Sequence, residues 1–264
     1  MMRAPPGSRG TSPGMPEGHL IHRHAAEQRA DLAGRAVRVS GPQGRFDARP
    51  WDGRMLTEVE AVGKHLLYHF EDTPTVHVHL GMRGIFLRYD GPGTSPRPGT
   101  RLRLATDEVA YDLIAPSRCE ALAAAQVAAL RGSLGPDPLR ADAVPEQAVA
   151  RLTAFTGPVG AAVLDQKVWS GIGNAWRAEL LFLAGLHPNA RGVSPEAAGR
   201  LWDTAVTYLA LGRDAGQVVS DPDAPSERWV YRREHCRRCG APVLTWQLAS
   251  RTAYSCPMEQ QECR

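Results

Sequence analysis

The 264-residue sequence has no run of eighteen apolar residues, so we expect no membrane-spanning helix. Its first fourteen residues carry arginines but no apolar stretch, which argues against a secretory signal peptide. Because proline, glycine and serine dominate residues 1–14, we predict that this extension is disordered and that the start is mis-assigned, with Met15 as the true first residue.

Cysteine is scarce and unevenly placed. Of five cysteines, Cys119 stands alone and the other four lie within the last 29 residues. A secreted disulfide scaffold spreads an even set of cysteines along a short chain. The clustering predicts instead a metal site in a reducing compartment, so we expect a cytoplasmic protein.

The chain also has little excess of positive over negative charge, because its formal net charge is only +3. Its distribution is more informative than its sum. Residues 228–264 contain seven arginines against three glutamates. A basic module on a near-neutral body fits contact with phosphate groups, and a solvated charged surface is the alternative.

Hydrophobic periodicity divides the chain into a mixed α+β, multidomain architecture. Apolar spacing predicts a helix over 18–35, short alternating runs predict a β-sandwich over 37–114, and further helices are predicted over 117–134 and 145–212. We therefore expect an N-terminal domain of helix plus β-sandwich (15–134), a helical domain with its linker (135–227) and a C-terminal ribbon (228–264).

The ribbon carries the strongest metal signal. Cys236-Arg-Arg-Cys239 is a tight knuckle, and Cys256 follows after sixteen residues. Such spacing aims thiolates at one tetrahedral structural zinc ion. A regular second knuckle would place cysteine at position 259, which is Glu259, so the fourth ligand is open between Cys263, Glu259 and His235. Thiolate chemistry favours Cys263.

A glycine-rich turn lies within the helical region. Gly171 and Gly173 allow close approach, and the bare amides of a helix that starts at Asn174 suit a phosphate. Arg177, one turn later, can add a charge contact or be solvated. The alternative is an ordinary helix start with Asn174 as its N-cap.

The segment Met15-Pro16-Glu17 precedes the first helix. Proline and glutamate at this place are ordinary helix-start chemistry. If the chain begins at Met15 and this methionine is removed, Pro16 becomes a free secondary amine. An α-amine is a better nucleophile at neutral pH than an unperturbed lysine, and attack on a sugar C1′ yields an iminium that acidifies the adjacent C2′ proton. Glu17 can then shuttle protons.

The three signals occur in order: Pro-Glu-Gly near a methionine, Gly-Ile-Gly-Asn at a helical turn, and a C-terminal cysteine ribbon. This combination resembles the formamidopyrimidine-DNA glycosylase / endonuclease VIII family, and Gly63-Lys64-His65-Leu66 is most similar to its actinobacterial endonuclease VIII branch. The resemblance implies a β-sandwich joined to a helix–two-turns–helix domain and a zinc ribbon, with DNA between them.

The resemblance also implies roles for single residues. Pro16 would be the nucleophile and Glu17 the proton donor, while Lys64 would contact phosphate beside the lesion. The remaining DNA contacts would come from Asn174 and Arg251 on the backbone, and from Met82, assisted by Arg83, in the gap left by an extruded base.

The implied function is that of a monomeric, bifunctional DNA glycosylase and AP lyase. It would act on double-stranded DNA with oxidised bases, chiefly pyrimidines, or abasic sites, and cut by β,δ-elimination with one structural zinc ion. The alternatives are a guanine-lesion glycosylase, a non-enzymatic damaged-DNA-binding protein if Pro16 is an internal residue, and a metal-dependent hydrolase. This last reading would use His65, His69, His77 and His79, which we expect instead to be packed or surface residues.

Overall fold

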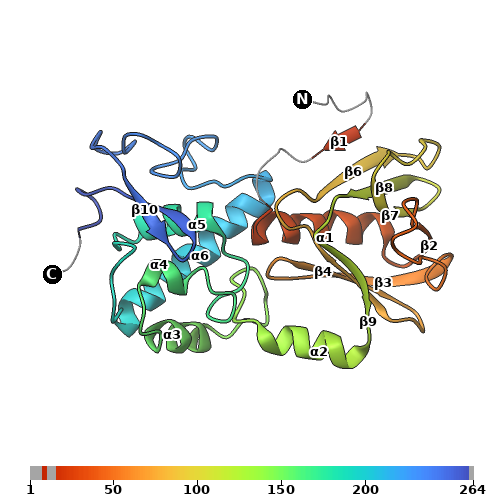
Figure 1. The fold of residues 1–264 in the computed structure, drawn as a ribbon, viewed down its shortest axis with the longest axis horizontal. Coiled ribbons are helices and arrows are strands. Elements are labelled where there is room, and N and C mark those ends of the chain that lie inside the picture. The colour runs from red at the N-terminus through yellow and green to blue at the C-terminus, as the bar shows by residue number, and fades with distance from the viewer. Residues whose placement is uncertain (1–7, 11–15, 262–264) are drawn as a thin grey trace. The chain divides into compact units, whose positions relative to one another are not determined.

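The computed structural model describes residues 8–10 and 16–261, which form two compact units (Figure 1). One unit contains Ile21–Arg131 and the described residues up to Pro16. The other contains Glu17–Leu20 and residues 132–261. Helix α1 (Gly18–Leu32) therefore begins in the second unit and continues in the first. Among the described residues, no helix is long and apolar enough to cross a lipid bilayer.

The first unit is built on antiparallel strands in the order β1-β6-β8-β7-β2-β3-β4-β5-β9, which begins with β1 (Ser8–Gly10). Strand β2 (Arg35–Ser40) joins the two halves of this sheet, since Arg35–Val37 pair with β3 in one half and Arg38–Ser40 pair with β7 in the other. The other bounds are β3 (Arg54–Val62), β4 (His65–Phe70), β5 (Thr75–His79), β6 (Ile85–Asp90), β7 (Thr100–Ala105), β8 (Val109–Ile114) and β9 (Arg118–Leu122).

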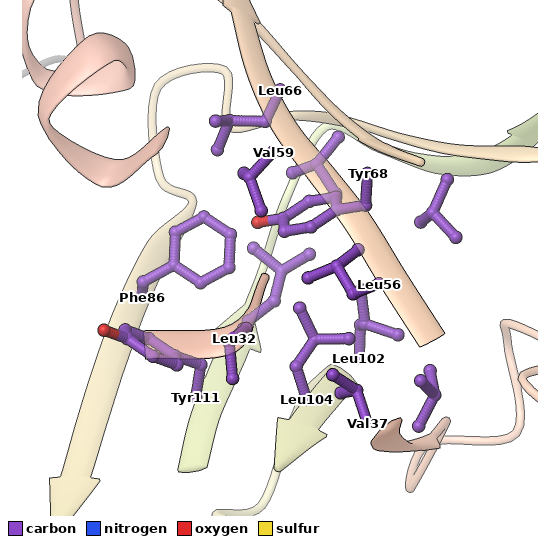
Figure 2. Packing of buried hydrophobic residues seen from close by; sticks show 14 of the residues in the cluster. Leu32, Val37, Leu56, Val59, Leu66, Tyr68, Phe86, Leu102, Leu104 and Tyr111 are labelled. Carbon is purple, nitrogen blue, oxygen red and sulfur yellow. The ribbon is translucent and has the colours of Figure 1, made fainter. Parts of the chain in front are cut away.

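One hydrophobic core joins the two halves of this sheet. Leu56, Leu66 and Tyr68 come from β3 and β4, and they pack in the same cluster as Leu102 and Leu104 of β7 (Figure 2). Helix α1 adds its own apolar side to this cluster. Side chains alternate between buried and exposed along β2, as expected for strands with one face on a core. The predicted helix and β-sandwich are confirmed.

The extension before Pro16 departs from the expectation in one place. Residues Ser8–Gly10 form strand β1, which pairs with β6 in antiparallel register. Without it, β6 would be an edge strand with unpaired backbone groups, and such edges accept an added strand readily. The rest of the segment that we expected to be disordered, 1–7 and 11–14, lies outside the described residues.

The stretch 117–134 was expected to be one helix, and this is wrong for its first part. Arg118–Leu122 form strand β9 against β5, and helix α2 spans only Ala124–Ser133. Alanine and leucine favour a helix locally, but β5 offers an open edge whose backbone groups β9 satisfies. Tertiary pairing therefore overrides the local preference.

The second unit contains four further helices and a hairpin. Helices α3 (Pro145–Thr153), α4 (Val159–Ala162), α5 (Asn174–Leu183) and α6 (Pro195–Ala215) share a core around Trp169, Trp176 and Trp202. Strands β10 (Leu244–Leu248) and β11 (Arg251–Ser255) form the ribbon hairpin. The ribbon groups with the helices in one compact unit and does not stand alone.

Candidate active site and metal centre

The Glu17 side chain closes the N-terminus of α5. Its carboxylate accepts hydrogen bonds from the backbone N–H of Gly173 (3.0 Å), Ala175 (2.9 Å) and Trp176 (3.3 Å), and the residue is only 3% exposed. Helix α5 has no side-chain cap of its own. The negative charge of Glu17 thus lies at the positive end of the helix dipole.

The Pro-Glu-Gly segment and the Gly-Ile-Gly-Asn turn approach so closely that glycine is required where they meet. A Cβ on Gly173 would lie 2.3 Å from the Glu17 Cδ atom, and a Cβ on Gly18 would lie 2.7 Å from the Gly171 Cα atom. The Gly18 N–H also donates to the Gly171 carbonyl at 2.8 Å. Pro-Glu-Gly and Gly-Ile-Gly-Asn are therefore in direct contact, and Pro16 precedes this contact by one residue.

Asn174 connects α5 to the ribbon hairpin. Its Nδ2 donates to the Thr252 carbonyl at 3.1 Å, and its buried Oδ1 accepts no hydrogen bond from the described residues. Arg251, the first residue of β11, is exposed one position away. The expected phosphate contacts Asn174 and Arg251 therefore lie within one local arrangement.

Arg177 differs from the expectation that it faces DNA. Its side chain is 1% exposed, and its guanidinium donates to the carbonyls of Leu248 (3.0 Å) and Thr252 (2.8 Å), with longer contacts to Gly160 and Arg251. Burial lowers the pKa of Arg177 to about 10, so the group stays protonated at neutral pH. Arg177 braces the hairpin against α5, because the β10–β11 backbone covers the helix face that carries it.

In the first unit, the expected Lys64 and Met82 lie at one end of the sheet. Lys64 follows Gly63, which has a positive φ of 58°, in the turn between β3 and β4. The pairing of His65 with His79 brings this turn to the end of β5, where the next turn carries Met82. Met82 is 64% exposed. A Cβ on Gly84 would lie 2.5 Å from the Leu80 carbonyl oxygen, so the turn is tight and presents its tip outward.

Arg83 is exposed in the same turn as Met82, as a residue that reaches a partner must be. The histidines of β4 and β5 form hydrogen-bonded contacts that the sequence did not predict in detail. His65 Nδ1 lies 2.9 Å from His77 Nε2, and His77 Nδ1 lies 3.0 Å from a Glu120 oxygen. The signal was visible as alternate histidines on one strand, but the partner Glu120 depends on sheet register.

Three cysteine side chains of the ribbon converge. The sulfur atoms of Cys236, Cys239 and Cys256 lie within 4.8 Å of one another, which is the only grouping of three potential metal ligands among the described residues. These three residues can hold a metal ion. The histidines of β4 and β5 do not form such a group, and Cys263 lies outside the described residues.

The backbone at Cys256 is held in place by the side chain of Gln260. Gln260, fully buried, accepts a hydrogen bond from the Cys256 N–H at 3.0 Å and donates to the Leu186 carbonyl at 2.8 Å. Glu259, one alternative fourth ligand, instead receives a hydrogen bond from Arg238 at 3.2 Å. Neither Glu259 nor His235 joins the group of three cysteines. Gln260 was not singled out from the sequence, because a buried amide gives no local pattern.

Two protein-family models and several named proteins match this chain. The formamidopyrimidine-DNA glycosylase N-terminal domain matches residues 15–117, and the H2TH domain of formamidopyrimidine-DNA glycosylase matches residues 134–221. A Mycobacterium bovis protein named Endonuclease 8 1 is 38% identical over 93% of this chain and 100% of its own length. A Mycolicibacterium smegmatis protein named DNA-(apurinic or apyrimidinic site) lyase Nei2 is 32% identical over 93% of this chain and 99% of its own.

The fold is also similar to solved structures. A complex between the Lactococcus lactis Fpg and DNA containing an abasic site has a TM-score of 0.78 at 21% identity, and it covers 93% of this chain and 100% of that one. A structure of MutM with DNA containing carbocyclic 8-oxo-G has a TM-score of 0.78 at 22% identity, covering 94% and 100%. At these identities the likeness concerns the fold.

Proposed function

The chain belongs to the formamidopyrimidine-DNA glycosylase family, and from that membership we infer that it is a DNA glycosylase of base-excision repair that also cuts the strand as an AP lyase. The observation that carries the proposal is the contact between Glu17 and the N-terminus of α5. It anchors the residue next to Pro16 at the glycine-rich turn of the H2TH domain.

Pro16 is proposed as the nucleophile in a chain that begins there. The family match starts at residue 15, which supports this start. The secondary amine attacks C1′ of the damaged nucleotide, and the C1′–N bond to the base breaks with its electron pair going to the base, which leaves as an anion and takes up a proton from water. The amine proton passes to the Glu17 carboxylate, which returns it to the sugar O4′ as the ring opens and the iminium forms.

Strand cutting follows from the iminium. Loss of the C2′ proton gives an enamine, and its electron pair expels the 3′ phosphate in β-elimination. A second elimination at the 5′ side leaves a gap. Oxidised pyrimidines and abasic sites in double-stranded DNA are the proposed substrates, since a base that stacks or pairs poorly costs least to extrude.

The DNA contacts divide between the two units. Lys64, with Met82 and Arg83, is proposed to act beside the lesion, and Asn174 and Arg251 are proposed to hold the backbone. Exposure of Met82 and Arg251 supports these roles. Arg177 is assigned a bracing role, because its guanidinium is already engaged by backbone carbonyls.

A single structural zinc ion is proposed in the ribbon, held by Cys236, Cys239, Cys256 and Cys263. Cys236 and Cys256 are buried in a small cluster, and such a small core is usually stapled by a metal. The ion would fix the hairpin that carries Arg251, and the chemistry at C1′ does not pass through it. The protein is proposed to work as a monomer on DNA in the cytoplasm or nucleoid.

Borohydride trapping on an abasic-site oligonucleotide tests the proposal. Two forms of the protein are compared: one begins at Pro16 and the other keeps residues 1–15. Borohydride reduces an iminium to a permanent protein–DNA crosslink, so a crosslink with the first form alone identifies Pro16. If neither form gives a crosslink while both bind DNA, the lyase mechanism is wrong and a damaged-DNA-binding protein is the better description. Comparison of an oxidised pyrimidine with an oxidised guanine decides the lesion preference.

A further inference from the structure

The ribbon segment 228–261 contains six arginines, and most of them have partners within the protein. Three form ion pairs with carboxylates: Arg233 with Glu227, Arg237 with Asp221 and Arg238 with Glu259. Arg228 donates to two backbone carbonyls. The other two, Arg232 and Arg251, are exposed and form no ion pair or side-chain hydrogen bond with any described residue. The unneutralised positive charge of this segment therefore lies on Arg232 and Arg251.

Arg232 differs from an ordinary solvated arginine in its backbone. Its φ is 56°, in the left-handed region, where the Cβ atom of most residues makes unfavourable contacts. Glycine would make the same turn without this cost. The chain thus has a charged side chain at a position where the backbone favours glycine, and backbone strain of this kind is concentrated at functional sites.

The Arg232 side chain is also held against an aromatic ring. Its guanidinium carbon lies 5.3 Å from the centre of the Tyr231 ring, within the range of a cation–π interaction. The Tyr231 ring in turn makes an edge contact with Tyr254 at a centroid distance of 5.2 Å. A guanidinium over a ring keeps its N–H donors for another acceptor, because these point outward in its own plane. A side chain held in this way has less rotamer freedom to lose when it binds a ligand.

The backbone before Arg232 is fixed to α5 by a buried carboxylate. Glu179 of α5 is completely buried and accepts hydrogen bonds from three consecutive backbone N–H groups. The donors are Trp229 (2.8 Å), Val230 (3.0 Å) and Tyr231 (2.8 Å). Because these amides directly precede Arg232, its position relative to α5 is set by the fold and not by a ligand.

These contacts place Arg232 beside the hairpin strand that carries Arg251. Tyr254, which contacts Tyr231, lies on β11 with Arg251. We propose that Arg232 binds a backbone phosphate of DNA, separate from the phosphate that Arg251 is proposed to hold. The inference rests on the proposed function, because it takes DNA as the ligand of the ribbon. A guanidinium matches a phosphate with two parallel hydrogen bonds, and such a contact adds affinity and orientation without reading the bases.

The salt dependence of DNA binding tests this assignment. Each phosphate contact contributes about 0.9 to the slope of log K against log salt. Binding to a duplex oligonucleotide that contains a stable abasic-site analogue is measured by fluorescence anisotropy over a salt series. Arg232→Gln is expected to lower the slope by about 0.9, whereas Arg232→Lys, which keeps the charge, is expected to retain it. An unchanged slope in Arg232→Gln overturns the proposal.

Arg232→Gly separates the loss of the contact from damage to the fold. Glycine adopts a φ of 56° without strain, so this variant should resist urea at least as well as Arg232→Gln and show the same loss of slope. Arg233→Gln is the matched control, because it removes the same charge from the adjacent residue, which is paired with Glu227 at 2.6 Å. Its slope should equal that of the unchanged protein. An equal loss in Arg233→Gln would show that net charge alone is responsible and would overturn the contact at Arg232.

The double variant of Arg232→Gln and Arg251→Gln shows whether two phosphates are held. Two separate contacts predict a loss of about 1.8, and a loss no greater than that of either single variant contradicts a second contact. Arg251→Gln alone distinguishes the failure of this inference from that of the proposed function. If Arg251→Gln lowers the slope and Arg232→Gln does not, only the assignment of Arg232 is wrong. If neither variant changes the slope, the proposed contact of the ribbon with DNA fails as well.

Discussion

The Glu17 side chain and the Gly173 backbone fill the same space so closely that a Cβ on Gly173 would lie 2.3 Å from the Glu17 Cδ atom. The two residues are 156 positions apart, yet a 3.0 Å hydrogen bond joins them. This contact joins the Pro-Glu segment directly to the glycine-rich helical turn. Glu17 supplies the cap that α5 lacks, because the N-cap residue of this helix, Gly173, makes no side-chain hydrogen bond.

Gly173→Ala tests this contact. The added methyl group must displace the Glu17 carboxylate from the three N–H groups, so we expect a loss of about 1–3 kcal/mol in the free energy of unfolding and a lower yield of borohydride crosslink. Gly199→Ala in α6 is the control, because its Cβ meets nothing within 4 Å. It should stabilise the protein by about 0.5–1 kcal/mol through helix propensity. Equal behaviour of the two variants in urea unfolding would refute the close contact.

Arg177 and Arg251 are expected to behave in opposite ways. Arg177→Met leaves buried carbonyls without their donor, so the free energy of unfolding should fall by an amount on the order of 3 kcal/mol. Arg251→Gln removes an exposed charge, so stability should hold while the salt slope of DNA binding falls by about 0.9. Urea unfolding and binding titrations over a salt series measure both. A stable Arg177→Met protein with a reduced slope would restore a direct DNA contact for Arg177.

The ribbon is expected to hold one zinc ion per chain. Burial raises the pKa of Cys256 to about 11, so metal binding must displace protons and should weaken as pH falls. Cys239→Ser should lose the ion and the ordered hairpin, measured by metal analysis and limited proteolysis. Cys119→Ser changes a cysteine packed on the sandwich core and should keep the full zinc content. Zinc retained in Cys239→Ser would rule out the proposed ligand set.

Acid sensitivity is expected to arise in part from His24. Burial, followed by Arg23, lowers its pKa to about 4 in the folded protein, against about 6.5 for an unperturbed histidine. Below pH 6.5 the unfolded chain binds a proton at His24 that the folded protein does not bind. The free energy of unfolding therefore falls by about 3 kcal/mol as the pH is lowered from 6.5 to 4. His24→Gln should flatten this slope in urea unfolding at several pH values, and an unchanged slope in this variant would contradict the role of His24.

Local patterns predicted much of this architecture. The alternation of β2 and the spacing of Cys236 and Cys239 are properties of a few adjacent residues, so the sequence alone indicated a strand and a metal knuckle. Arg118–Leu122 was assigned to a helix because its strand depends on an open edge of β5, which is far away in sequence.

Side-chain environments were harder to predict than elements. Arg177 lies one turn after Asn174, and nothing nearby in sequence indicates that a hairpin 71–75 residues later covers it. The contact of His77 with Glu120 likewise follows from the register of β5 with β9. Both relationships arise from tertiary pairing, which a single sequence does not encode as a local pattern.

Helix α5 has a consequence beyond its place in the core. Its first turn binds Glu17, and its side chains Asn174 and Arg177 both donate to the Thr252 carbonyl of the hairpin. Helix α5 thus contacts the cysteine ribbon along its side and Glu17, the residue after Pro16, at its N-terminus. The proposed metal site and the residue after the proposed nucleophile therefore share one support, the helix α5.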